Sequence, residues 1–265
     1  MVDRLKPDLT TKNIRNAGES VRILIRELQG WDTVIWEDDF LTYKTDAELQ
    51  SRYLDRVTGG DGSIDIVAAG VSGEATIDVG DGGTSGDNEY GGWLLGNLQW
   101  KGDLNCFTIC RFKISAIGTT KVEFGFTDAV DDAGAVDVLA TPSVTATNAA
   151  VWVVDTDDTA TWQALGVKAT VIQKDETVLY ADVSGTSTAT PIADTYFYMG
   201  VFLEGDHAMY SMWDASGNKV GDDLIIDNAI EGGTTVAPWI FVQNRAGSQD
   251  RFLTVDYTMT GQRRS

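Results

Sequence analysis

The carboxylates best placed to catalyse hydrolysis lie in one consecutive run, Glu37, Asp38 and Asp39, near the start of the apolar part of the chain. Hydrolysis of a glycosidic bond with retention needs two carboxyl groups about 5 Å apart. Neighbouring residues of a strand point to opposite faces, so a consecutive run does not supply such a pair. We therefore predict no catalytic residue here and expect the run to end a strand and form a turn.

The histidine and cysteine residues are too few for a metal or nucleophile site. The chain has one histidine, His207, and two cysteines, Cys106 and Cys110. A zinc site or a Ser-His-Asp triad would depend on His207 alone, which lies beside a predicted turn. The cysteines share one predicted strand and would lie about 13 Å apart, whereas a disulfide needs Cα atoms within about 7 Å. We predict a surface histidine and two free core thiols, which fits assembly in a reducing cytoplasm.

Three loops are rich in oxygen ligands of the kind that hard cations prefer. Their residues are Asp61 and Asp65; Asp78, Asp81, Asp87, Asn88 and Glu89; and Asp128, Asp131 and Asp132. None of the loops has the spacing of a defined calcium loop such as the EF-hand. We predict solvated acidic turns and no cofactor, with Ca²⁺ bound in one of these loops as the alternative.

A sugar site would need an exposed aromatic side chain with polar neighbours. The candidate tryptophans are Trp93, Trp100, Trp152, Trp162, Trp213 and Trp239. We expect most of them to be core residues, because they lie within predicted strands. No glycine-rich loop joins a predicted strand to a helix, so no nucleotide site is predicted.

The elements that must position these residues are predicted to be strands. Residues 196–203 are apolar on both faces, which indicates a central strand covered on both sides, and residues 208–213 return beside it. Residues 105–117 and 120–127 alternate cleanly between apolar and mostly polar positions. We predict that these last two are neighbouring antiparallel strands.

Composition favours a single large all-β body. The chain has 265 residues, 43% hydrophobic, with 28 Gly and only 4 Pro, as expected for many strands joined by tight turns. We expect a dozen or more strands, no signal peptide and no membrane span. The formal net charge of −20 repels phosphates and anionic lipids, so we predict neither nucleic acid nor membrane as a partner.

Residues 1–30 differ from the remainder, since they carry a net charge of +2 and leave −22 for the rest of the chain. Apolar residues recur in steps of three and four, as on one face of a short helix, and arginines lie between them. The predicted interface comprises Ile14, Ala17, Val21, Leu24, Leu28, Arg15, Arg22 and Arg26. A lone helix this short is marginal in water, so we predict that the stripe packs on another chain. Docking on its own sandwich and a disordered tail are the alternatives.

The order of features resembles a concanavalin A-like lectin/glucanase sandwich, a jelly roll of two antiparallel sheets. The segments that carry the resemblance are the acidic-aromatic turn 36–40, the strands 107–114, 121–126 and 196–203, and the last strand 252–257. The resemblance covers residues 31–260 and implies that the last strand lies beside the first. Glucanases of this class carry Glu-x-Asp-x-Glu on one strand, and this sequence has no such run.

The resemblance and the charged leader together give the predicted organisation and function. Residues 1–30 are an attachment arm and residues 31–265 a β-sandwich domain. Similar sandwiches occur in structural proteins of tailed bacteriophages, which implies a non-enzymatic virion protein, a capsid decoration or head/tail appendage subunit assembled in the host cytoplasm. Its partners would be sister subunits, as a homo-oligomer, and a capsid or tail protein. The alternatives are a carbohydrate-binding host-receptor adhesin that binds a host glycan, and a glycoside hydrolase without a recognisable motif.

Overall fold

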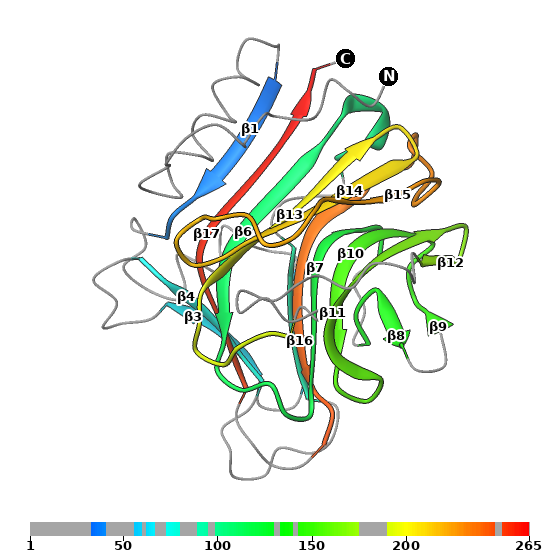
Figure 1. The fold of residues 1–265 in the computed structure, drawn as a ribbon. Helices are drawn as coiled ribbons and strands as arrows, with labels where there is room; N and C mark the ends of the chain where they lie inside the picture. Colours follow the sequence, from blue (N-terminus) through cyan, green and yellow to red (C-terminus); the bar gives the residue numbers. More distant parts are fainter. Residues whose placement is uncertain are drawn as a thin grey trace.

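Two antiparallel β-sheets packed face to face make up the computed structural model of this protein (Figure 1). The structure describes residues 33–40, 56–59, 62–66, 73–79, 89–94, 99–129, 133–139, 143–174, 190–246 and 251–264. Within these residues lie 17 strands and one short 3-10 helix, Gly102–Leu104. The predicted all-β jelly-roll architecture is confirmed. No helix in the described part of the chain is long and apolar enough to cross a membrane.

The first sheet has eight strands in the order β15-β14-β13-β6-β17-β4-β3, with β1 beside β17. Their bounds are β1 Thr33–Asp38, β3 Ser63–Ile66, β4 Ala75–Asp78, β6 Phe107–Ile114, β13 Phe197–Glu204, β14 His207–Trp213, β15 Leu224–Ile226 and β17 Phe252–Arg263. The first and last strands pair antiparallel, with Thr33 opposite Arg263, as the resemblance implied (Figure 1, blue beside red).

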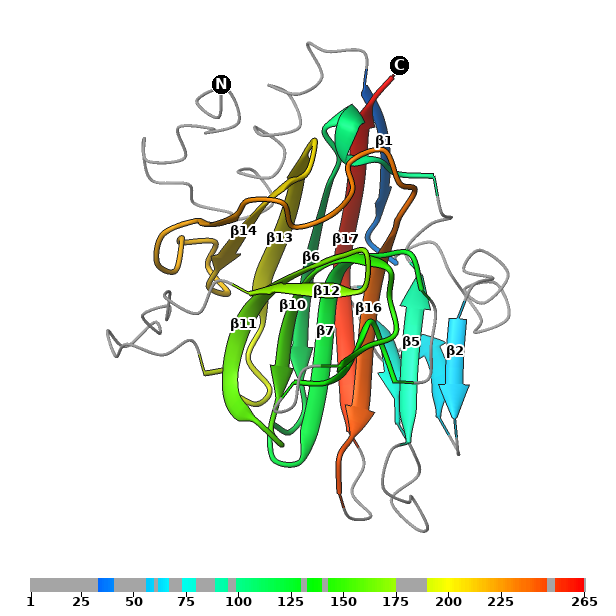
Figure 2. The same cartoon turned by 90° about the vertical axis from the view of Figure 1, so that its right-hand side faces the viewer.

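The second sheet has seven strands in the order β12-β11-β10-β7-β16-β5-β2, most of which Figure 2 shows side by side. Their bounds are β2 Arg56–Gly59, β5 Tyr90–Leu94, β7 Thr120–Thr127, β10 Asn148–Asp155, β11 Thr159–Lys168, β12 Val171–Lys174 and β16 Ala237–Asn244. A separate hairpin of β8 (Val136–Val138) and β9 (Ser143–Val144) lies on the outward face of this sheet.

The central strand was predicted correctly. β13 lies between β14 and β6, and seven of its eight residues are buried. Met199 and Val201 face the core between the sheets. Phe202 belongs to a second cluster on the outward face with Phe107 and Met259, so both faces of the strand are apolar and covered.

The predicted pairing of residues 105–117 with 120–127 is wrong, because the two strands lie in different sheets. β6 pairs with β13 and β17, and β7 pairs with β10 and β16. The link between them crosses from one layer to the other, with Thr119 at φ 54°. The alternation of apolar and polar residues identifies the inward face of a strand correctly. It does not predict which other strand pairs with it. The two inward faces meet across the core, where the rings of Phe112 and Phe124 are 5.9 Å apart.

Phe112 is the aromatic centre of this core. Its fully buried ring lies 4.5 Å from Phe197 and 6.2 Å from Trp162, in addition to Phe124. We expect Phe112→Ala to lower the free energy of unfolding by about 3–5 kcal/mol, because it leaves a cavity between both sheets. Urea denaturation measures the loss. Val171→Ala, at a side chain that is 57% exposed on an edge strand, should change it by less than about 0.5 kcal/mol. Equal effects of the two substitutions would contradict this core.

Candidate functional site

A cavity of about 290 Å³ opens at one end of the sandwich, between the loop before β13 and the loop after β14. Its floor consists of buried core side chains, Trp162, Phe197, Met212 and Val220. The apolar part of its rim is Ile192, which is 55% exposed, with the half-buried Tyr196 and Trp213. Polar groups on the rim come from Thr190, Thr195, Asp214 and Ser216. The site is therefore mainly an apolar and aromatic cavity with a few polar residues at its rim.

The side chains that line the cavity lie at the start of β13 and at the end of β14, and strand alternation decides which face each of them occupies. Phe197 and Met212 point inward from β13 and β14, whereas Trp213 lies on the outward face opposite Tyr198. Tyr196 comes just before β13 on that same outward face. The cavity thus lies where inward-facing and outward-facing residues of two paired strands meet at the strand ends.

The loop after β14 is fixed by the carboxylate of Asp214. Its oxygens accept hydrogen bonds from the backbone amides of Ser216 (2.9 Å) and Asn218 (2.8 Å) and from the Asn218 side chain (2.9 Å). Gly217 takes a φ of 80°, which glycine adopts without strain. These bonds hold the Ser216 side of the rim in place before any ligand arrives.

The side chain of Tyr196 is held by contacts to its hydroxyl and to its ring. Its hydroxyl donates to Glu74 at 2.6 Å, and its ring lies under the Arg111 guanidinium at 4.0 Å and the Lys113 ammonium at 4.7 Å. Arg111 in turn pairs with Asp256. Burial, followed by the Glu74 hydrogen bond, raises the pKa of Tyr196 well above its usual value, so the hydroxyl stays protonated. The Tyr196 side of the rim is thereby held in place.

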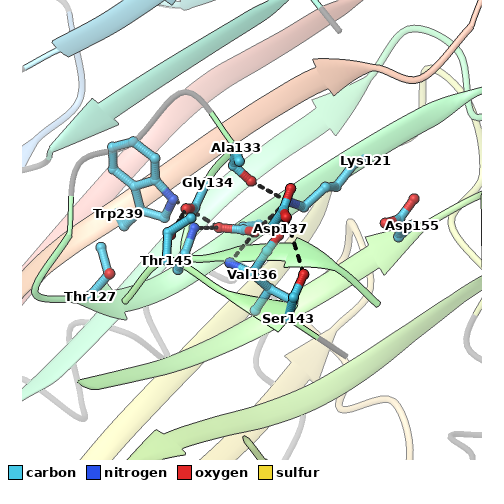
Figure 3. A network of polar contacts seen from close by, with 12 residues as sticks. Lys121, Thr127, Ala133, Gly134, Val136, Asp137, Ser143, Thr145, Asp155 and Trp239 are labelled. Atoms are coloured by element: carbon cyan, nitrogen blue, oxygen red, sulfur yellow. Dashed lines mark hydrogen bonds and ion pairs between the residues drawn. The ribbon is translucent and has the colours of Figure 1, made fainter. Parts of the chain in front are cut away.

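A second polar cluster lies on the outward face of β7, where Lys121 and Glu123 are fully buried under the β8–β9 hairpin (Figure 3). The Lys121 ammonium contacts Glu123 Oε1 at 3.0 Å. Glu123 also accepts hydrogen bonds from the Ala135 and Val136 amides and from the Trp239 indole. Burial lowers the pKa of Lys121, and the nearby Glu123 carboxylate opposes that shift. Because both carboxylate oxygens are occupied, this cluster positions a hairpin and offers no group for acid–base chemistry.

Among the described acidic residues considered for catalysis or calcium, Asp38 and Asp128 hold turns, as predicted, whereas Glu37, Asp65 and Asp78 lie within strands, so the turn prediction is wrong for Asp65 and Asp78. β1 ends at Asp38, whose carboxylate accepts a hydrogen bond from the Phe40 amide at 2.9 Å. Asp128 accepts hydrogen bonds from the Thr147 and Asn148 amides, both at 2.9 Å. Among the described residues, no group of three or more His, Cys, Asp or Glu side chains could hold a metal ion. The structure does not describe Asp61, Asp81, Asp87, Asn88, Asp131 or Asp132.

The remaining predicted residues fall into three groups. His207 is half exposed and bonds to Asp227 at 2.8 Å, which confirms a surface histidine. Trp93, Trp100, Trp152 and Trp239 are core residues, as expected. Trp162 is also a core residue and lines the cavity together with the half-buried Trp213. The eight predicted interface residues, Ile14, Ala17, Val21, Leu24, Leu28, Arg15, Arg22 and Arg26, lie outside the described residues, as does the predicted domain boundary at residues 30 and 31.

Sequence reasoning did not identify Ile192, Tyr196 or Thr195 as site residues. A usable signal existed for Tyr196 and Trp213, because both occupy outward positions of the alternation next to loops with small polar residues. Nothing local marks Ile192, which lies within an apolar and threonine-rich segment of no clear period.

Comparison with known proteins supports the fold and leaves the family open. No family model matches the chain, and no curated protein matches it. A protein of unknown function from Shewanella oneidensis MR-1 is similar in structure, with a TM-score of 0.58 and 12% identity over 96% of each chain. Arcelin-5, a lectin-like defence protein from Phaseolus vulgaris, has a TM-score of 0.51 and 9% identity over 88% of this chain and 100% of that one. A mutant of the Emp46p carbohydrate recognition domain has a TM-score of 0.51 and 12% identity over 84% and 94% of the two chains. At these identities the likeness shows a lectin-like jelly roll and nothing finer.

Cys106 and Cys110 are free and buried in the core between the sheets, as predicted. Burial raises the pKa of both thiols well above the usual value, so neither is a thiolate at neutral pH. We expect neither cysteine to react with Ellman's reagent in the native protein and both to react in concentrated urea. Fast labelling of the native protein would contradict their placement between the sheets.

Proposed function

We propose that this chain is a non-enzymatic carbohydrate-binding protein that holds a sugar in the cavity between the loops before β13 and after β14. The observation that carries the proposal is the aromatic rim formed by Trp213 and by Tyr196, which Glu74 holds in place, beside Thr195, Asp214 and Ser216. The lectin-like fold of the structural neighbours supports it.

The rim matches the two kinds of surface on a sugar ring. The C–H face of a pyranose is apolar and packs on an indole or phenol, with about 25 cal/mol gained per Å² buried. Its hydroxyls need hydrogen-bond partners at the edge, which the loop residues supply. Because Tyr196 and the Asp214 loop are already fixed, little ordering entropy is lost on binding.

The ligand is found with a glycan array and its affinity measured by isothermal titration. We expect Trp213→Ala to weaken binding at least tenfold, because stacking on a large aromatic side chain is worth about 1.5–3 kcal/mol. Ile192→Ala on the rim should weaken it less. The matched control is Ile225→Ala on β15, where the side chain is 40% exposed and outside the cavity, and affinity should be unchanged.

Two results would count against the sugar site. One is the absence of any glycan ligand on the array, and the other is equal affinity of the Trp213→Ala variant and the native chain. Release of reducing ends from a bound glycan would instead favour the hydrolase alternative.

A second role, attachment to a larger assembly such as a virion, is carried by the amphipathic stripe of residues 1–30 and by the opposite charges of arm (+2) and body (−22). We expect deletion of residues 1–30 to leave a folded sandwich that still binds sugar and has lost its assembly with sister chains. Sedimentation measures the mass of both forms. An unchanged mass would argue against the arm as the attachment segment.

A further inference from the structure

The outward face of the first sheet carries an apolar cluster that is closed off from water, here called the outer cluster. Its four most buried side chains point away from the core between the sheets, yet their exposure is only 0% to 7%: Phe107, Ile109, Phe202 and Met259. Four partly buried side chains of the same face pack against them: Ile35, Met209, Trp213 and Tyr257. The outer cluster therefore extends over five strands that lie side by side, β1, β17, β6, β13 and β14 (Figure 1).

Burial of the outer cluster requires a layer above it. A fully buried side chain has neighbours on every side, and a sheet supplies them only beside and below it. Among the described residues, every member of the outer cluster comes from the strands of this sheet. The outward face of a two-layer antiparallel sandwich usually meets water and carries polar side chains. An outward face that is apolar and buried instead needs a third layer of apolar side chains.

The N-terminal segment leads directly to the edge of the outer cluster. β1 begins at Thr33, and Ile35, two residues later, is itself a member. The apolar stripe predicted from the sequence ends at Leu28. The chain from Leu28 to Thr33 spans at most about 17 Å when extended, which is long enough to turn the stripe onto this face.

The stripe and the outer cluster match in length. A helix formed by the 15 residues 14–28 would be about 22 Å long. Five adjacent strands cover four spacings of about 4.8 Å, or about 19 Å. At 3.6 residues per turn, the stripe falls on one side of this helix, and Arg15, Arg22 and Arg26 fall on the other. A helix docked by its stripe therefore keeps its arginines in water.

We propose that residues 14–28 dock on the outer cluster of their own chain and form a third layer over the first sheet. The sequence left docking on its own sandwich open as an alternative, and the outer cluster supplies the surface for it. The stripe then buries its apolar side without a partner chain. Assembly with sister chains relies on the arginine side, whose charge is opposite to that of the acidic body of a neighbouring copy.

Labelling of a thiol within the outer cluster tests this docking. Met259→Cys places a thiol there, while native Cys110, opposite Thr258 on the neighbouring strand, faces the core between the sheets and serves as the internal control. Iodoacetamide is added to the full chain, and peptide masses report each label. We expect both thiols to react at least a hundredfold more slowly than the thiol of Val171→Cys, at a position that is 57% exposed.

Two matched substitutions in the Met259→Cys chain separate the stripe from the rest of the segment. Leu24→Gln places a polar amide in the stripe and should speed labelling of the introduced thiol at least tenfold, because a buried leucine contributes more than this factor to docking. Ile23→Gln makes the same chemical change at the neighbouring position, outside the stripe, and should change the rate less than twofold. Cys110 should stay unlabelled in both, because the segment can lift without opening the core.

Any of three results overturns the proposal. Fast labelling of Met259→Cys in the otherwise native chain shows that the outer cluster is open to water. Equal rates for Leu24→Gln and Ile23→Gln show that the stripe does not cover it. A rate that rises on dilution shows that the stripe comes from a sister chain. If Leu24→Gln also exposes Cys110, the smaller change Leu24→Ala is compared with Ile23→Ala by the same criteria.

Discussion

The buried charges on the outward face of β7 constrain the hairpin that covers part of the second sheet. Lys121 and Glu123 can remain out of water only while each finds its full set of partners, because an unpaired charge in a protein interior is strongly destabilising. The partners come from the backbone of the β8–β9 hairpin. The hairpin must therefore stay closed, and its Ala135, Val136 and Leu139 then pack on the outward side chains of β10 and β11. The Lys121–Glu123 pair thus positions the hairpin side chains that form the apolar cluster on β10 and β11.

Both faces of β7 are buried as a result. Val122, Phe124 and Phe126 face the core between the sheets, and Lys121 and Glu123 face the interior under the hairpin, so every residue of the strand is buried. β13 in the other sheet is also covered on both faces, but with apolar side chains on both. The aromatic core between the two sheets is continuous with the floor of the cavity through Trp162 and Phe197.

Several acidic residues in the described part of the chain hold turns. Asp38, Asp128 and Asp214 each accept hydrogen bonds from backbone amides of a loop, which satisfies donors that a strand end would otherwise leave unpaired. These carboxylates thus have a structural role at the ends of strands. Two buried cations of the described chain, Lys121 and Arg251, likewise donate to oxygen atoms of nearby loops.

Elements with local signals could be predicted from the sequence. Strands such as β13 and β14, the turn between them and the free thiols of Cys106 and Cys110 follow from period-two alternation, turn residues and the 3.3 Å rise of a strand. Tertiary structure alone decided which strands are neighbours, because hydrogen bonds between strands join backbone groups that are the same for every residue. It therefore placed β6 and β7 in different sheets and buried Lys121. It also brought Trp162, Ile192 and Trp213 to one cavity across gaps in the sequence that no local pattern spans.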